Sequence, residues 1–132
     1  MPDTYTHAID VQFRDLDPRG HANHVIYVSY CEQAKAALFA EVLETSLADA
    51  STVVRSLDVE YERAVTLGDR VVVTLRISHL GRTSYTIEYD LAVDGERVAT
   101  ARTASVSLDG AGNPEPLPDT WRERLKPYLI VE

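Results

Sequence analysis

The residue types best suited to chemistry gather between Asp15 and His24. This stretch reads Asp-Leu-Asp-Pro-Arg-Gly-His-Ala-Asn-His, and it combines two carboxylates, two imidazoles and an asparagine. Asp17 is the candidate base or nucleophile, because an aspartate with an ordinary pKa of about 3.9 is ionised at neutral pH. An Asp-Pro pair also begins many loops, so Asp17 read alone is a turn residue. The residues around Asp17 are therefore needed to distinguish a catalytic role from a structural role in the turn.

A long helix is predicted directly after this stretch, over residues 24–44, because no Gly or Pro interrupts it. The first N–H groups of a helix lack intrahelical acceptors and carry roughly half a positive charge. Amides of His24 or its neighbours are therefore candidates for an oxyanion site, where each donor supplies about 3 to 4 kcal/mol to a transition state. Asn23 is a good N-cap for this helix, with positioning of substrate or water as the equal alternative. Apolar residues recur along the helix at Tyr27, Cys31, Ala34, Leu38 and Val42.

Other polar residues of the stretch have structural interpretations. Asp15 is expected to hold the loop through Arg14 or Arg19, and His21 is expected to organise it by a hydrogen bond. The spacing His21-x-x-His24 near an aspartate is compatible with a metal site, but the sequence offers no well-placed third ligand. We therefore predict no metal site and no cofactor.

Alternating apolar and polar residues predict strands on both sides of the helix. Asp94-Gly95 is a strong signal for a type I′ hairpin turn. One helix beside several antiparallel strands predicts an α+β architecture in which the helix covers one face of a curved sheet. Much of the apolar sheet then stays uncovered, so a homo-oligomer is expected. The expected strands are residues 6–13, 57–61, 71–79, 85–93 and 97–108, followed by a short helix at 119–125.

Composition limits the possible partners. The 132 residues carry a formal net charge of -8, which argues against a nucleic-acid partner because phosphate binding needs a basic face. No stretch is apolar and long enough to span a membrane, so a cytoplasmic location is expected. Cys31 is the only cysteine and lies on the apolar stripe of the helix, where a small buried hydrophobe is the expected role. No repeat or linker divides residues 1–132, which predicts one domain.

The segment from Phe13 to Tyr27 resembles the signature of the 4-hydroxybenzoyl-CoA thioesterase and YbgC-like acyl-CoA thioesterases. The resemblance continues through Tyr-Cys-Glu-Gln-Ala at 30–34, through Val-Glu-Tyr-Glu-Arg-Ala at 59–64, and through His-Leu-Gly-Arg-Thr-Ser at 79–84. It implies a hot-dog fold, in which a curved antiparallel sheet wraps around one long helix. It also implies an acyl-CoA thioester hydrolase that releases a free carboxylic acid and coenzyme A, in a dimer or tetramer with the pocket at a subunit interface.

The resemblance also assigns roles to residues. The aspartate before x-x-Gly maps onto Asp17 as the catalytic carboxylate, and the residue seven positions later, His24, offers its amide to the thioester oxygen. The His24 ring as an acid for the departing thiolate is the less favoured alternative. The implied catalytic residues are Asp17, Asn23 and His24, and the implied substrate-binding residues are Gly20, His21, Tyr27, Arg82, Thr83 and Ser84, the last three for coenzyme A.

Three alternatives stay open at this point. A non-catalytic acyl-CoA-binding protein would share most of the pocket. A hot-dog hydratase or dehydratase is disfavoured, because those enzymes typically separate Asp and His by five residues whereas Asp17 and His24 are seven apart. A carrier-protein thioester could replace acyl-CoA, although the acidic chain makes docking to an acidic carrier less natural. The acyl group itself is not specified by the sequence.

Overall fold

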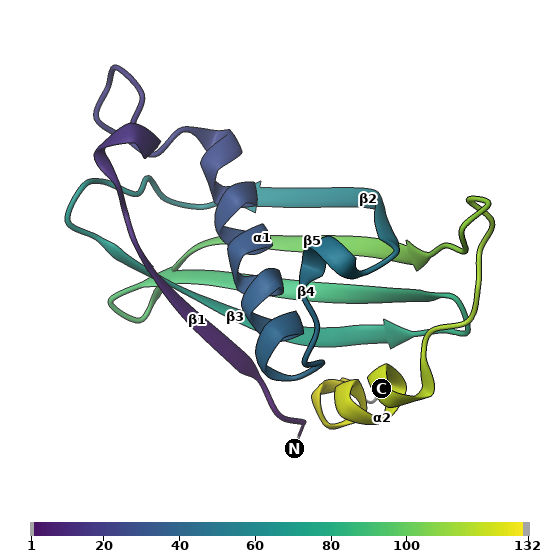
Figure 1. Ribbon diagram of the computed structural model, residues 1–132. Coiled ribbons are helices and arrows are strands. Elements are labelled where there is room, and N and C mark those ends of the chain that lie inside the picture. The colour runs from purple at the N-terminus through teal and green to yellow at the C-terminus, as the bar shows by residue number, and fades with distance from the viewer. Residues whose placement is uncertain (1, 131–132) are drawn as a thin grey trace.

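Five strands form one antiparallel sheet, and the long helix α1 crosses one face of it (Figure 1). The computed structural model describes residues 2–130. The strand order is β1-β3-β4-β5-β2, which leaves β1 and β2 as the two edges. The elements are β1 (Tyr5–Asp10), η1 (Phe13–Asp15), α1 (His24–Glu41), η2 (Leu47–Asp49), β2 (Thr52–Tyr61), β3 (Arg70–Leu80), β4 (Ser84–Val93), β5 (Glu96–Ser107), α2 (Asp119–Leu125) and η3 (Lys126–Tyr128).

The core lies between the helix and the inner face of the sheet. Side chains on a strand alternate between its two faces, so every second residue of β3 and β4 points to the face of the sheet that α1 crosses. This confirms the α+β architecture predicted from the alternation. One residue departs from the pattern: a register shift between Ile77 and His79 leaves His79 exposed, although the alternation predicts it to be inward. The buried residues of these two strands are Val71, Val73, Leu75, Ile77, Tyr85, Ile87, Tyr89, Leu91 and Val93.

Three predicted element ends are wrong, each for a local reason. The second strand begins at Thr52 rather than 57, because a register shift between Val54 and Ser56 interrupts the alternation on which the prediction rests. The first strand ends at Asp10 rather than 13, because the Gln12 amide donates to the Asp15 carboxylate at 2.9 Å and starts a 3-10 turn. The long helix ends at Glu41 rather than 44, since Glu44 adopts a positive φ of 54°. The predicted hairpin is confirmed, with φ of 51° at Asp94 and 80° at Gly95. The predicted terminal helix is also confirmed as α2.

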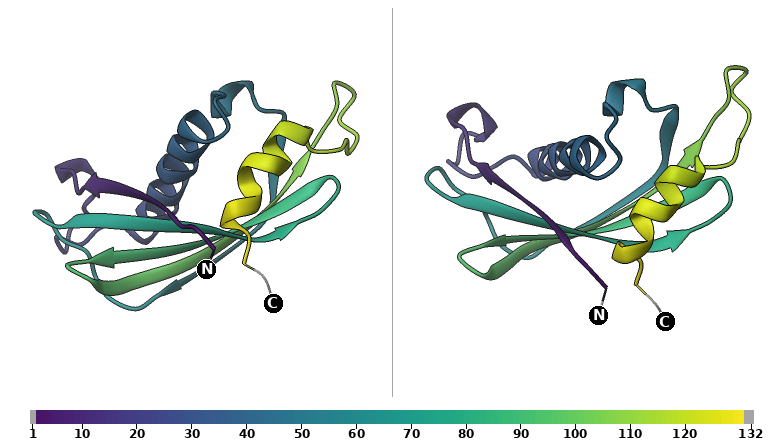
Figure 2. Two further views of the ribbon diagram at one scale, coloured as in Figure 1. Left: turned by 90° about the horizontal axis from the view of Figure 1, so that it is seen from below. Right: turned by 60° about the horizontal axis from the view of Figure 1, so that its bottom comes forward.

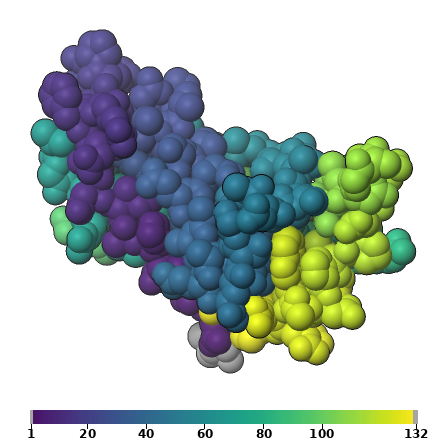
Figure 3. All heavy atoms as spheres, in the orientation of Figure 1, coloured from purple at the N-terminus to yellow at the C-terminus, as the bar shows by residue number. Residues whose placement is uncertain are grey.

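The C-terminal helix α2 closes the layer at the far end of α1 (Figure 2). Trp121 meets Phe39 of α1 edge to face, with ring centroids 5.3 Å apart. The chain after α2 reaches the sheet, where the Ile130 amide donates to the Ile77 carbonyl at 2.7 Å. One end of the helix–sheet layer is thus sealed, whereas the other end carries the polar loop before α1, which projects in the space-filling view (Figure 3).

Lys35 is a buried cation inside this layer. The residue is 2% exposed, and its ammonium donates one hydrogen bond to Ser105 Oγ at 3.3 Å. The rings of Phe39 and Tyr85 lie 5.8 Å and 5.5 Å from Nζ. Among residues 2–130 no carboxylate forms an ion pair with it. The desolvation of the ammonium is therefore offset only by one hydrogen bond and two aromatic faces.

We expect Lys35→Met to raise the free energy of unfolding by about 1 kcal/mol, because methionine keeps most of the apolar stem and removes the buried charge. Urea unfolding followed by circular dichroism measures the change. Lys126→Met, at an exposed lysine, is the control and should leave the midpoint unchanged. A lower midpoint for Lys35→Met would show that the ammonium itself stabilises the fold.

Candidate active site

The loop before α1 holds the Asp17 carboxylate in a fixed orientation. One oxygen, Oδ1, accepts hydrogen bonds from the amides of Arg19 at 2.9 Å and His21 at 3.3 Å. The other, Oδ2, meets the Arg19 guanidinium at 3.2 Å. The Asp17 amide donates to the His21 carbonyl at 2.8 Å, and Gly20 turns the chain between them with φ +82°. The loop that the sequence predicts is therefore built around this carboxylate.

These contacts affect the ionisation of Asp17. Partial desolvation acts to raise the pKa of the carboxyl group, whose side chain is 13% exposed. The amide of Arg19, its guanidinium and the amide of His21 act in the opposite direction, and together they lower the pKa of Asp17 below its ordinary value. The carboxylate is consequently ionised throughout the neutral range and available as base or nucleophile.

We expect Arg19→Gln to shift the acid limb of the pH–rate profile to higher pH. Removing the guanidinium takes away a cation that favours the charged form, so the pKa of Asp17 rises. A reaction that needs the ionised carboxylate then declines at a higher pH, with turnover near pH 7 little changed. The measurement is kcat against pH between about 4 and 8, with Arg14→Gln as the control. A profile of Arg19→Gln that overlays the parent contradicts this electrostatic role.

The start of α1 offers one backbone donor to the solvent. Asn23 is the N-cap, because its side-chain oxygen accepts from the Val25 amide at 3.0 Å. Its carbonyl accepts from the Ile26 amide at 2.8 Å. Among the described residues the His24 amide has no hydrogen-bond acceptor. The capping role predicted for Asn23 is confirmed, and the donor left free is the one that the sequence assigns to an oxyanion.

Asp15 holds the loop, as predicted, but through other partners. Its Oδ2 accepts from the Tyr30 hydroxyl at 2.8 Å and from the Gln12 amide at 2.9 Å. Neither Arg14 nor Arg19 bonds to it among residues 2–130, so the predicted arginine partners are wrong. Tyr30 comes from the second turn of α1, which is why the sequence gives no local sign of this contact.

A pocket of about 350 Å³ brings the loop, the helix start and the end of β2 together. Tyr27 is 4% exposed, and its hydroxyl donates to the Arg63 carbonyl at 3.0 Å. Tyr61 meets the Tyr27 ring edge to face at 5.0 Å. Tyr61 and Arg63 are site residues that sequence reasoning does not select, although both fall in the segment that resembles the thioesterase signature. The pocket is lined by Asp17, Arg19, His21, Ala22, His24, Tyr27, Tyr61, Glu62, Arg63 and Ala64.

The other predicted substrate residues are placed differently. Gly20 shapes the loop without lining the pocket. The hairpin of Arg82, Thr83 and Ser84 lies at the opposite end of the sheet, beside α2, as Figures 1 and 2 show. The Thr83 carbonyl accepts from the Ser107 amide, whereas Tyr61 pairs with Ala99 on the same strand. Eight residues of β5 separate these two points by roughly 27 Å, so this hairpin and the pocket of one chain do not meet.

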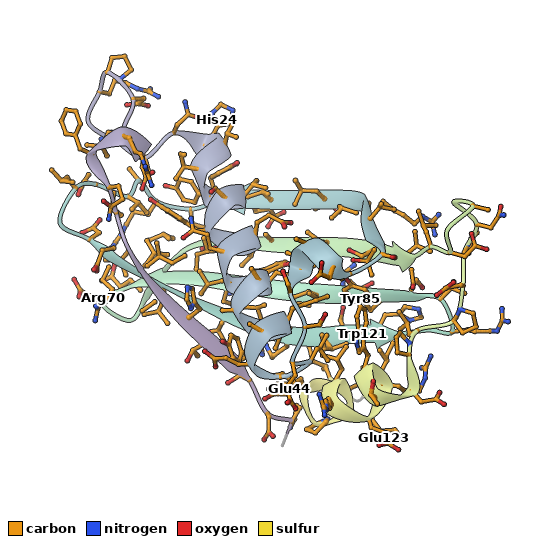
Figure 4. The ribbon with its side chains drawn as sticks, in the orientation of Figure 1. His24, Glu44, Arg70, Tyr85, Trp121 and Glu123 are labelled. Atoms are coloured by element: carbon orange, nitrogen blue, oxygen red, sulfur yellow. The ribbon has the colours of Figure 1, made fainter. Side chains whose placement is uncertain are left out.

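Cys31 and the histidines are the remaining reactive groups near the site. Burial raises the pKa of the Cys31 thiol to about 12, so the group stays protonated and packs as a small hydrophobe. His21 contributes backbone groups to the loop, and His24 stands at the tip of α1 (Figure 4). Residues 2–130 contain no group of three or more His, Cys, Asp or Glu side chains that could hold a metal ion.

Comparison with known proteins decides the family. Residues 11–125 match the sequence model of the thioesterase-like superfamily. The chain belongs to this superfamily. A thioesterase of Thermus thermophilus, whose crystal structure contains coenzyme A and zinc, superposes on this thioesterase with a TM-score of 0.85 and 39% identity. The alignment covers 92% of this chain and 90% of that one.

Two further relatives share one named activity. The 1,4-dihydroxy-2-naphthoyl-CoA hydrolase of Synechococcus elongatus is 29% identical over 128 residues, covering 92% of this chain and 91% of that protein. Slr0204, a 1,4-dihydroxy-2-naphthoyl-CoA thioesterase from Synechocystis, has a TM-score of 0.87 at 20% identity over 94% of this chain and 96% of that one, which supports the fold alone. The hot-dog fold and the thioesterase class predicted from the sequence are confirmed.

No helix among the described residues is both long and apolar enough to cross a membrane. The cytoplasmic location predicted from the sequence stays a prediction.

Proposed function

We propose that this thioesterase hydrolyses acyl-CoA, with Asp17 as the catalytic carboxylate and the His24 amide as the oxyanion donor. The observation that supports the proposal is the pocket, whose lining includes both Asp17, with its oriented carboxylate, and His24, whose amide has no acceptor. A thioester carbonyl between them would have its carbon toward Asp17 and its oxygen toward the start of α1. Developing negative charge on that oxygen is what a helix start stabilises.

Two routes begin from this geometry. As a general base, Asp17 takes a proton from water, the water oxygen bonds to the carbonyl carbon, and the C–S bond breaks. The thiolate of coenzyme A then receives that proton. As a nucleophile, Asp17 bonds to the carbonyl carbon itself and expels the thiolate, and water cleaves the resulting anhydride. A single turnover in ¹⁸O-labelled water identifies the second route if the label appears in Asp17, because only water that cleaves the anhydride at the Asp17 carbonyl carbon leaves the label there.

The acyl group is proposed to be aromatic. The walls next to the helix start are rings, with His24 6.3 Å from Tyr61 and Tyr27 5.0 Å from Tyr61, both edge to face. Such rings favour a flat aromatic group by offset or edge contacts. The substrate named for the Synechococcus elongatus relative, 1,4-dihydroxy-2-naphthoyl-CoA, is of this class. A bicyclic or monocyclic aromatic acyl-CoA is therefore the proposed substrate class.

The working unit is proposed to be a homo-oligomer of at least two chains, formed through the edge strand β2. The residues on the inner face of β2 pair with buried residues of β5, but they are themselves exposed because α1 does not cover them. An uncovered apolar edge strand of ten residues is a template for pairing with another chain. Coenzyme A contacts from Arg82, Thr83 and Ser84 would have to come from a second copy, because the hairpin is remote from the pocket of its own chain. The exposed apolar residues of β2 are Val53, Val54, Leu57 and Tyr61.

Thiol release across a panel of thioesters tests the proposal. The panel contains 1,4-dihydroxy-2-naphthoyl-CoA, benzoyl-CoA, a medium-chain aliphatic acyl-CoA and one aromatic acyl group on an acyl carrier protein. The expected order of kcat/KM places the aromatic CoA thioesters first. Binding without thiol release would instead identify a non-catalytic acyl-CoA-binding protein. A preference for the carrier-protein thioester would correct the substrate to that carrier.

A further inference from the structure

The phenol of Tyr61 links the sheet to the start of α1. Its hydroxyl donates to the carbonyl of His24 at 2.7 Å. Its ring packs against two neighbours from the first turn of that helix, the imidazole of His24 at 6.3 Å and the ring of Tyr27 at 5.0 Å. Three contacts from one side chain thus converge on the helix turn that carries the amide without an acceptor.

The position of Tyr61 in the sheet lets these contacts hold the start of α1 in place. Tyr61 is the last residue of β2 and is held opposite Ala99 on β5 by the strand ladder. Its side chain is 47% exposed and lines the pocket, so the ring is a wall of the site and not part of the core. The hydrogen bond therefore ties the helix start to the sheet beside the pocket.

We infer that Tyr61 is a positioning residue, which holds the first turn of α1 so that the His24 amide points into the pocket. This inference rests on the proposed function of that amide. An oxyanion donor acts only from the correct place, and small displacements of catalytic groups lower the rate strongly. Tyr61 does not polarise the donor itself, because the His24 carbonyl belongs to the next peptide group along the chain. Its contribution is orientation.

Tyr61→Phe tests this inference, because it keeps the ring contacts and removes only the hydroxyl. We expect kcat on the preferred acyl-CoA to fall about 5- to 20-fold with KM within about twofold of the parent. Tyr61→Leu, which also removes the ring, should lower kcat further. Tyr85→Phe is the matched control, since its hydroxyl bonds to Thr52 Oγ1 at 3.1 Å away from the pocket. It should retain the kcat of the parent.

Hydrogen exchange supplies a readout that does not depend on catalysis. Within α1 the His24 carbonyl is the acceptor for the Val28 amide, so a loosened first turn exchanges this amide faster. We expect faster exchange over residues 24–28 in Tyr61→Phe and unchanged exchange in Tyr85→Phe.

The outcomes separate this inference from the proposed function. If the parent hydrolyses acyl-CoA but Tyr61→Phe keeps its kcat, or changes only KM, the positioning role is wrong. If the parent hydrolyses no thioester, the proposed function is wrong, and unchanged exchange at residues 24–28 would then also overturn the role of Tyr61 in ordering the helix start.

Discussion

Asp17→Asn is expected to lower kcat at least about a hundredfold while the protein stays folded and oligomeric. Asparagine has nearly the shape of aspartate, and its side-chain oxygen can still accept from the amides of Arg19 and His21. It has neither the charge to take a proton from water nor the nucleophilicity to attack a carbonyl. The loss should therefore fall on turnover, measured as thiol release at saturating acyl-CoA.

Asp15→Asn is the matched control for this prediction. Both aspartates lie in the same loop, but the Asp15 carboxylate is occupied by the Tyr30 hydroxyl and the Gln12 amide. We expect Asp15→Asn to stay within about fivefold of the parent, because an amide oxygen can accept the same two donors. If Asp17→Asn keeps parental turnover, or if Asp15→Asn loses as much, the assignment of Asp17 is wrong.

Leu57→Asp is expected to separate the subunits and to lower kcat/KM at least about tenfold. Leu57 is 43% exposed on the inner face of β2, and a carboxylate placed between two copies would be desolvated without a partner. In the proposed assembly a second copy supplies the coenzyme A hairpin, so separating the chains removes part of the site. Light scattering after size exclusion measures the mass, and thiol release measures the activity.

Leu67→Asp is the matched control, because Leu67 is 55% exposed in the turn between β2 and β3, away from the β2 edge. This variant should keep both the mass and the activity of the parent. A parent that runs as a monomer and hydrolyses acyl-CoA at full rate would contradict the proposed assembly while leaving the assignment of Asp17 intact.

The order of strands and helices could be predicted from the sequence, because it depends on the spacing of apolar residues and on the residue types that form turns. Alternation along β3 and β4 identified both strands and their inner faces, and Asp94-Gly95 fixed the hairpin. Element ends were less accessible. The first strand ends early because one carboxylate caps a 3-10 turn, and the helix ends early because Glu44 takes a positive φ. Neither cause changes the spacing of apolar residues, so the sequence pattern does not predict it.

The sequence predicts those parts of the candidate site whose residues are close together along the chain. It does not predict the contacts between distant segments. Asp17, Asn23 and His24 lie within one turn and one helix start, so their spacing carries the information. The contacts that come from distant segments, such as Tyr61 on His24 or Tyr30 on Asp15, depend on how strands and helix pack. The resemblance assigns Arg82 to coenzyme A, but a single chain keeps that hairpin at the other end of the sheet from the pocket. Only the proposed assembly, in which a second copy supplies the hairpin, would bring Arg82 to the site.

The most direct test of the central claim is a crystal structure with a ketone analogue of an aromatic acyl-CoA, in which a methylene group replaces the sulfur. We predict that the carbonyl oxygen lies about 2.7 to 3.1 Å from the His24 amide nitrogen, the range for an oxyanion donor, with the Asp17 carboxylate facing the carbonyl carbon. A carbonyl bound elsewhere, for example in the groove on the outer sheet face near Arg76 and Glu88, would contradict the account.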